Sequence, residues 1–293
     1  MSIAVVTMVW NDNWFLRRWM SYYAPLVGER NLYVVSHGRD DSLREIVGNA
    51  NLIEMPRDPN DLNFDTRRWG FLSSYTSALT RYHDAVICLD VDELLIPVNE
   101  GDSLVSVIER FDCDAPRAVP GFELFPQKSD AANVDRAERI APLMAGAMFN
   151  PFYSKSGIAM RPVEFFPGAH GMMDEPAKYC GDLALLHLRF ANLEELRRRN
   201  AARMDISDGA IPDEQSFREE GKPFATWRKA DKVTRQAFRG FRLAREVEWG
   251  EMLSTVAVEL ERLRVRRGRV HKFLTKRYEP LRASLPPWFA DQF

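Results

Sequence analysis

The stretch that decides the fold spans residues 85–97 and reads AVICLDVDELLIP. Its first five residues are apolar and rich in β-branched side chains, which predicts a short, buried strand. The strand ends in three acids, Asp90, Asp92 and Glu93. Charges are rarely buried without a partner, so acids in this position indicate a bound cation.

The two aspartates lie two positions apart, which in an extended chain directs both side chains to one side of the strand. Two converging carboxylates suit a hard divalent ion, Mn²⁺ or Mg²⁺, that keeps coordination positions open for phosphate oxygens. The sequence therefore predicts a metal site at Asp90 and Asp92. A solvated turn at the end of the strand is the alternative interpretation, since an isolated Asp-x-Asp pair is common.

The composition of the chain limits the classes of protein to which it can belong. The chain has 293 residues, 45% of them hydrophobic, and a formal net charge of −2, which allows a large core and predicts no general affinity for nucleic acid. The three cysteines, at positions 88, 113 and 180, lack C-x-x-C spacing, which argues against disulfides or structural zinc and favours a reducing compartment. The first residues lack the features of a signal peptide, and no long apolar segment occurs. We therefore expect a cytoplasmic protein.

Strands and helices alternate up to the acidic motif. The predicted strands cover residues 3–9, 31–36, 52–55 and 85–89. The predicted helices, with apolar side chains at helical spacing, cover residues 14–26, 42–47 and 66–81. This alternation predicts an α/β fold with a mostly parallel sheet and helices on both faces. Ligands of such sheets bind beyond the carboxyl ends of the strands, where residues 11–12, the turn at residues 37–40 and the Asp-x-Asp pair all fall.

The second half of the chain changes character. Further strands are predicted at residues 118–125, 153–166 and 183–190. From about residue 193 the chain is charged and helical, with one or two helices expected between Val233 and about Tyr278. We therefore divide the chain into a sheet-based unit of residues 1–200 and a helical C-terminal extension of residues 201–293.

A series of motifs spans residues 3–190: Thr7-Met8-Val9, Asn11-Asp12, Trp19 with Tyr22-Tyr23, Gly28, the strand and turn of residues 32–41, Asp90-Val91-Asp92-Glu93, the basic strand of residues 155–161, Gly168-x-His170 and His187-Leu188-Arg189. Their order and spacing resemble those of glycosyltransferases with the GT-A fold, in particular a family 2-like and family 92-like group. Two segments depart from the pattern: Trp10-Asn11-Asp12 replaces a basic–acidic pair, and residues 36–41 replace Asp-Asp-Gly-Ser.

The resemblance implies a Rossmann-like GT-A domain that moves a sugar from a nucleotide-sugar donor to a glycan, a lipid-linked or another hydroxyl acceptor. It implies that Asp92 ligates the metal and that Asp90 binds it through water or holds the donor ribose. In several metal-dependent relatives a late histidine is a further ligand, and His187 and His170 are the candidates here. A structural, hydrogen-bonded histidine is the alternative for both.

Four residues are candidates for binding the donor. By the resemblance, Asp12 contacts the nucleobase or ribose, although an N-cap of the following helix is an equal alternative. Asp40 follows a strand and a glycine turn and is placed near the nucleoside, with a plain turn aspartate as the alternative. Arg68 is a candidate for the pyrophosphate, unless it is a solvated side chain paired with Asp65. Lys155 is a further candidate for the phosphates.

The catalytic base is assigned to the loop that follows His170. An inverting transfer needs a group that takes the proton of the acceptor hydroxyl. Asp174 and Glu175 are the carboxylates of this loop. Ordinary loop charges are the alternative interpretation of both residues.

A basic segment lies near the C-terminus. Eight arginines and lysines fall within residues 262–277, interleaved with apolar side chains. A basic amphipathic helix of this kind can contact anionic lipid, so a peripheral position at the inner face of the membrane is one expectation. A solvated helix face or a surface for a protein partner is the alternative.

Two other functions stay open. A haloacid dehalogenase-type phosphatase also places Asp-x-Asp after an apolar strand and would use Asp90 as its nucleophile, but its motif normally ends the first strand, whereas three strands precede it here. A non-catalytic carbohydrate-binding protein with a degenerate transferase fold is the second alternative. The intact Asp90 and Asp92 argue against it.

Overall fold

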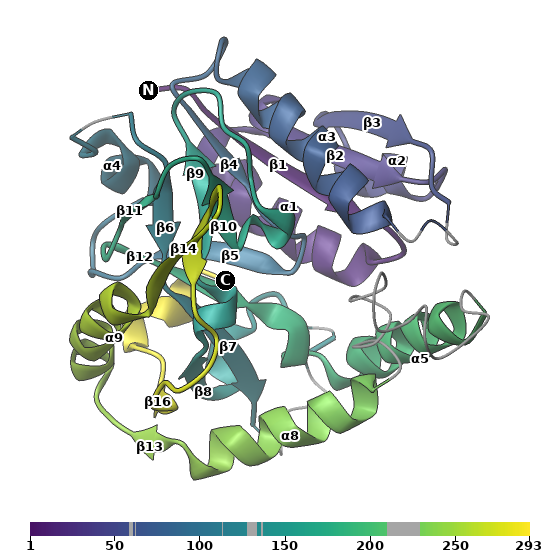
Figure 1. Ribbon diagram of the computed structural model, residues 1–293. Coiled ribbons are helices and arrows are strands. Elements are labelled where there is room, and N and C mark those ends of the chain that lie inside the picture. Colours follow the sequence, from purple (N-terminus) through teal and green to yellow (C-terminus); the bar gives the residue numbers. More distant parts are fainter. Residues whose placement is uncertain (59–60, 62, 113, 128–133, 136, 210–228) are drawn as a thin grey trace.

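The computed structural model describes residues 1–58, 61, 63–112, 114–127, 134–135, 137–209 and 229–293. These residues form a seven-stranded, a six-stranded and a three-stranded sheet, with helices packed around them (Figure 1). The predicted α/β class with a large, mostly parallel sheet is confirmed.

The seven-stranded sheet has the order β11-β6-β9-β4-β1-β2-β3. Its strands are β1 (Ile3–Val9), β2 (Leu32–His37), β3 (Asn51–Met55), β4 (Ala85–Cys88), β6 (Arg117–Val119), β9 (Lys155–Ala159) and β11 (Lys178–Tyr179). The four strands from β3 to β4 run parallel, whereas β9 is antiparallel to both of its neighbours. The carboxyl ends of β1, β2 and β4 therefore meet at one edge, as the sequence predicts.

The helices that connect these strands are α1 (Asn13–Val27), α2 (Leu43–Val47) and α3 (Phe64–Leu79). Each agrees with its predicted range to within two or three residues. The connections from β1 to β2 and from β3 to β4 cross the sheet in opposite directions, so right-handed crossovers place α1 and α3 on opposite faces. The apolar faces of these helices are buried, with Trp19 of α1 and Trp69 of α3 at most 1% exposed.

The six-stranded sheet has the order β13-β16-β8-β7-β12-β5. Its strands are β5 (Glu93–Pro97), β7 (Gly121–Pro126), β8 (Met144–Phe149), β12 (Leu183–His187), β13 (Arg245–Glu246) and β16 (Leu281–Ala283). The chain leaves the first sheet at Cys88 and enters this second sheet at Glu93, so the Asp-x-Asp pair lies in the junction between the two sheets. Helix α1 contacts both sheets, and Tyr22 on it donates a hydrogen bond of 2.6 Å to the carbonyl of Leu95 in β5.

Gly121 is required where the two sheets approach each other. A Cβ atom at this position would lie 2.1 Å from the carbonyl carbon of Tyr153, in the short 3₁₀ segment Pro151–Tyr153 that precedes β9. Only glycine allows this approach. The close packing fixes the start of β9 and therefore the position of Lys155.

Three predicted strands are shorter than expected. The strand at residues 118–125 is divided into β6 and β7 at Pro120, which has no N–H group for a continuous ladder. The strand at residues 153–166 is confined to β9, and the strand at residues 183–190 ends at His187, where a 3₁₀ turn begins.

The C-terminal part contains α5 (Leu193–Gly209), α8 (Ala230–Leu243) and α9 (Trp249–Leu263), and α8 packs against α5 (Figure 1). Residues 210–228 lie outside the described residues. The expectation of helix as far as Tyr278 is wrong after Leu263, because β14 (Arg264–Arg267) and β15 (Val270–Phe273) form a hairpin, and β16 joins the six-stranded sheet. Gly268 in the two-residue turn has a φ of +60°, a conformation that favours glycine and closes such hairpins. The division at residue 200 stays a prediction.

The prediction of a basic amphipathic helix within residues 262–277 is wrong for the same reason. Strand β15 pairs with β10 (Gly171–Met173), and the basic side chains of the hairpin are distributed over a β-ribbon rather than one helical face. None of the helices in the described part of the chain has both the length and the apolar character needed to span a bilayer.

Candidate functional site

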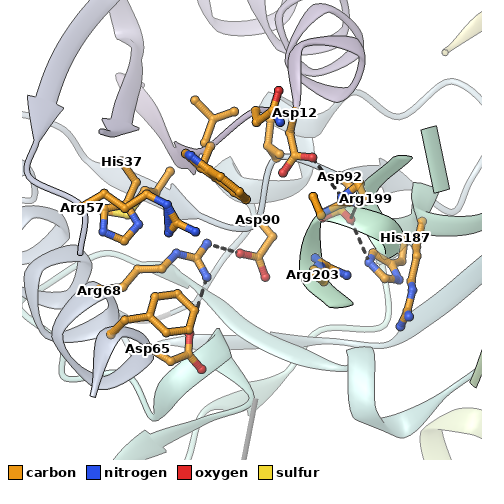
Figure 2. A pocket seen from close by; sticks show the side chains of 18 of the residues that line it. Asp12, His37, Arg57, Asp65, Arg68, Asp90, Asp92, His187, Arg199 and Arg203 are labelled. Atoms are coloured by element: carbon orange, nitrogen blue, oxygen red, sulfur yellow. Dashed lines mark hydrogen bonds and ion pairs between the residues drawn. The ribbon is translucent and has the colours of Figure 1, made fainter. Parts of the chain in front are cut away.

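A cavity of about 270 Å³ lies at the carboxyl ends of β1, β2 and β4 (Figure 2). Its walls come from the segments that follow these strands, from the first turn of α3, from the segment between β8 and β9, and from α5. The Asp-x-Asp pair faces this cavity from the junction between the two sheets. Both aspartates of the predicted site therefore line one cavity at the carboxyl edge of the sheet, and its function stays a prediction.

The cavity carries an excess of positive charge. Among the described residues that line it, the basic side chains are Arg57, Arg68, Lys155, Arg189, Arg198, Arg199 and Arg203, and the carboxylates are Asp12, Asp65, Asp90 and Asp92. With the histidines neutral, these side chains have a formal excess of three positive charges, and Glu93 and Glu195, which pair with Lys155 and Arg198, offset two of the three. The remaining excess suits an anionic ligand.

Asp90 is held by two cations. One carboxylate oxygen accepts a hydrogen bond from Arg68 and the other accepts one of 2.6 Å from Nζ of Lys155. Lys155 is 1% exposed, and its Nζ also lies 2.7 Å from Oε1 of Glu93. Burial alone would raise the pKa of Asp90, but the charges of Lys155 and Arg68 hold that pKa well below its usual range. Asp90 is therefore an anion at neutral pH, fixed in one orientation.

Asp92 is also paired twice. Its Oδ2 accepts a hydrogen bond of 2.7 Å from Nη1 of Arg199, and it lies 3.3 Å from Nε2 of His187 (Figure 2). Nε of the same arginine lies 2.9 Å from Oδ1 of Asp12. Burial opposes ionisation, yet Arg199 and His187 keep the pKa of Asp92 well below its usual value. Arg199 thus bridges carboxylates that follow two neighbouring strands, β1 and β4.

Both predicted histidines line the cavity, in different electrostatic surroundings. His187 lies opposite Glu93 in the antiparallel pair of β12 and β5, and its ring stacks on Tyr153 at 3.9 Å between centroids. Burial alone would lower the pKa of His187, but the charge of Asp92, together with hydrogen bonds to Asp92 and Glu123, raises it. Burial together with the charge of Lys155 lowers the pKa of His170 to about 3, so this imidazole is neutral.

The candidate donor-binding residues are not all brought together. Asp12, Arg68 and Lys155 line the cavity, whereas Asp40 does not. Asp12 precedes α1, but its carboxylate makes no capping hydrogen bond and pairs with Arg199 instead. Oδ1 of Asp40 accepts hydrogen bonds from the backbone N–H and the hydroxyl of Ser42, at 3.0 and 2.6 Å, which is the geometry of a turn aspartate.

The structure does not bring the two predicted catalytic carboxylates to the cavity. Asp174 pairs with Arg269 in the turn of the β14–β15 hairpin, with an Nε–Oδ1 distance of 2.7 Å. Glu175 pairs with Arg161. The loop after His170 is turned towards the hairpin because β10 pairs with β15, and this pairing was not expected from sequence.

Several residues that line the cavity were not predicted from the sequence. Arg199 and Arg203 lie four positions apart on α5 and therefore project from one face of that helix. The guanidinium of Arg57 lies 3.7 Å above the ring of Trp10, and the ring of His37 stacks on Phe64. The i, i+4 spacing of the two arginines on a predicted helix is a signal in the sequence. Nothing local, however, places that helix beside the Asp-x-Asp pair.

The contacts of the acids bear on whether they could hold the predicted metal ion. Within the described residues, no group of three or more His, Cys, Asp or Glu side chains is arranged to hold a metal ion. Both oxygens of Asp90 and Oδ2 of Asp92 already face cationic or imidazole nitrogens. As arranged, these residues do not fit a divalent ion, and the Mn²⁺ or Mg²⁺ ion stays a prediction.

The solved structures described here are distant likenesses of this chain. No known protein family and no curated protein matches the chain. Among solved structures, a mannose-1-phosphate geranyltransferase from Thermus thermophilus is 12% identical, with 77% of this chain and 68% of that chain covered and a TM-score of 0.30. A cytidylyltransferase from Leptospira borgpetersenii is 13% identical, with 43% and 54% covered and a TM-score of 0.26.

A third solved structure is a glucosyl-3-phosphoglycerate synthase from Mycobacterium tuberculosis in complex with phosphoglyceric acid. It is 16% identical, with 58% of this chain and 61% of that chain covered and a TM-score of 0.31. TM-scores from 0.26 to 0.31 are too low to indicate a function for this chain.

Proposed function

We propose that the protein is a glycosyltransferase that binds a nucleotide-sugar donor in this cavity and transfers the sugar to a hydroxyl of a glycan, a lipid-linked or another acceptor. The observation that carries the proposal is the excess of positive charge around the Asp-x-Asp pair, at the carboxyl edge of a parallel sheet. A nucleoside diphosphate leaves with several negative charges, and fixed cations stabilise that charge as it develops. The GT-A resemblance of the sequence supports the same reaction.

The cations of the cavity suit the diphosphate of such a donor. Arg68 lies on one side of the Asp-x-Asp pair, and Arg199 and Arg203 lie on the other (Figure 2). Lys155 donates to Asp90 of the pair and also lines the cavity. Guanidinium groups bind phosphate oxygens through two parallel hydrogen bonds, which fix the orientation of the leaving group. Trp10 and the stacked ring of His37 provide flat surfaces at the ends of β1 and β2 for the nucleoside.

Asp65 is the cavity carboxylate best suited to take the proton of the acceptor. The other three carboxylates of the cavity have ion-pair partners within 2.9 Å, whereas the nearest such partner of Asp65 is Nη1 of Arg68 at 3.8 Å. Burial outweighs the nearby arginine and raises the pKa of Asp65, which makes it a stronger base than an ordinary carboxylate. This assignment replaces the one to Asp174 and Glu175.

The arrangement disfavours the phosphatase alternative. A phosphatase of that type needs a free oxygen of Asp90 to attack a phosphorus atom. Here Arg68 and Lys155 occupy one oxygen each, and Lys155 is itself fixed by Glu93. A non-catalytic carbohydrate-binding protein would bind sugars, but it would not turn over a nucleotide sugar.

A two-stage experiment tests the proposal. Thermal unfolding is first measured with a panel of nucleoside diphosphates and nucleotide sugars, because a ligand that binds the folded protein raises its Tm. Nucleotide sugars that raise the Tm are then incubated with glycan and lipid-linked acceptors, and release of nucleoside diphosphate is measured. We expect stabilisation by one class of nucleotide and release of its diphosphate. A protein that no nucleotide stabilises, or that forms pyrophosphate from a nucleoside triphosphate and a sugar phosphate, would contradict the proposal.

A further inference from the structure

We infer that the cavity neutralises the diphosphate of its donor with its own arginine and lysine side chains, and that Arg199 stands where the Asp-x-Asp sequence predicts a divalent metal ion. This inference rests on the proposed function. It differs from the expectation drawn from sequence, because it assigns to Asp90 and Asp92 the task of orienting cations rather than ligating a metal.

The position of Arg199 carries the argument. Its guanidinium lies within 3 Å of two carboxylates, at 2.7 Å from Asp92 and 2.9 Å from Asp12. Its side chain is 9% exposed and packs over the ring of Phe15 at 4.5 Å, so it is held in place by α1 as well as by the acids. A buried cation that bridges two carboxylates occupies the place of a metal ion there: it offsets part of their charge and lines the cavity with guanidinium N–H groups.

The second carboxylate of the motif is arranged in the same way. Asp90 holds Arg68 and Lys155, and Glu93 fixes Lys155 from behind. Both aspartates of the motif are thus neutralised by groups of the protein. A divalent ion would need a carboxylate whose negative charge is not already paired, and neither aspartate offers one.

The charge of the whole cavity points to the same conclusion. A divalent ion would add two positive charges to a cavity whose lining side chains already carry more positive than negative charge, and it would have to displace a buried guanidinium from Asp92. A diphosphate instead offsets that excess. A guanidinium has five N–H donors in a fixed fork, so Arg199 can hold its two acids through Nε and Nη1 and still donate to a phosphate oxygen.

The test measures nucleotide binding with and without metal. UDP, GDP, CDP, ADP and dTDP are titrated calorimetrically into the full chain, once in EDTA and once in excess Mn²⁺. We expect the diphosphate that binds to do so with the same affinity in both conditions. Binding that requires Mn²⁺ would overturn this inference and leave the proposed function intact. Absence of binding in both conditions would overturn the proposed function and the inference together.

Variants of α5 sharpen the test. We expect Arg199→Met to lower the affinity for the diphosphate in EDTA by about tenfold or more, the usual effect of losing a hydrogen bond to a charged group. Arg197→Met is the matched control, because Arg197 is exposed on the same helix and does not line the cavity. Equal binding by Arg199→Met and the control would overturn the inference. If Arg199→Met does not fold, the wild-type titrations in EDTA and Mn²⁺ still decide.

Titration with Mn²⁺ alone provides an independent measurement. We expect the wild-type protein to bind no stoichiometric Mn²⁺ in an electron paramagnetic resonance titration. Folded Arg199→Met leaves Asp12 and Asp92 without their shared cation, so it should gain affinity for Mn²⁺. Stoichiometric Mn²⁺ binding by the wild-type protein would overturn the inference, whatever the variant does.

Discussion

Basic side chains and carboxylates pair in two regions of this molecule: the cavity at the carboxyl edge of the seven-stranded sheet, and the β14–β15 hairpin. In the cavity, the side chains of Lys155 and Arg199 are 1% and 9% exposed. At the hairpin, those of Arg269 and Asp174 are 61% and 59% exposed. The pairs have the same chemistry, but water and salt screen the second region far more than the first. Burial therefore decides which of these ion pairs contribute measurably to stability and to binding.

The largest expected effect comes from breaking a buried pair. Lys155→Met leaves the fully buried Glu93 and the partly exposed Asp90 without their shared cation. Removing one partner of a buried ion pair typically costs about 3–5 kcal/mol, and we expect a loss of that size in the free energy of unfolding measured with urea. A loss below about 1 kcal/mol, typical of exposed pairs, would mean that Lys155 is solvated and that the two regions are alike.

The second effect concerns catalysis and compares one carboxylate from each region. If Asp65 takes the proton of the acceptor, Asp65→Asn should lower kcat by about 100-fold or more, the usual contribution of a general base, with little change in KM for the donor. Asp174→Asn is the matched control, because Asp174 lies outside the cavity, and its turnover should equal that of the wild-type protein. The opposite result, with Asp174→Asn inactive and Asp65→Asn active, would restore the assignment made from sequence.

The third effect is a pH dependence that only a buried group can produce. The pKa of His170 is about 3 in the folded protein and near 6.5 in the unfolded chain, so the unfolded chain takes up the proton first as the pH falls. His170 therefore lowers stability below pH 6.5, by up to about 1.4 kcal/mol per pH unit. Urea unfolding between pH 7 and pH 5 should show a steeper loss for the wild-type protein than for His170→Phe.

His187 provides the control of opposite sign. Its folded-state pKa is raised, so its stabilising contribution is complete below its unfolded-state pKa and is lost as the pH rises through the folded-state value. His187→Phe should therefore leave the acid slope between pH 6.5 and pH 5 unchanged. An unchanged acid slope in His170→Phe would show that water reaches this imidazole.

The smallest effect is expected at the hairpin. Arg269→Met removes the pairs of Arg269 with Asp174 and Glu164. Both pairs are exposed, and water and salt screen them, so we expect the urea midpoint to match that of the wild-type protein within error. A clear shift of the midpoint would mean that the hairpin pairs act as a rigid network, and the contrast with the cavity would be weaker than proposed.

The sequence predicted the fold where the signal is local. The apolar run before Asp90 and the alternation of strands and helices are read within windows of about 15 residues, and these elements are present where expected. The same signals placed residues 11–12, the turn at residues 37–40 and the Asp-x-Asp pair at one edge of the sheet, and all of these except residues 38–40 of the turn line one cavity there. Local patterning failed at residues 264–273, which were predicted to be helical. They form a hairpin whose strand β15 pairs with the distant strand β10, and no local pattern shows that partner.

The amino-acid sequence by itself thus determined a mostly parallel α/β sheet and the position of an acidic motif at its carboxyl edge, because hydrophobic periodicity and β-branching act over a few residues. Only the tertiary structure decided which cation faces each acid. Lys155 reaches Asp90 across 65 positions of the chain, and Arg199 reaches Asp92 across 107. Such partners are chosen by how β9 and α5 pack against the sheet junction, and no local pattern in the sequence records the distance between side chains so far apart in the chain.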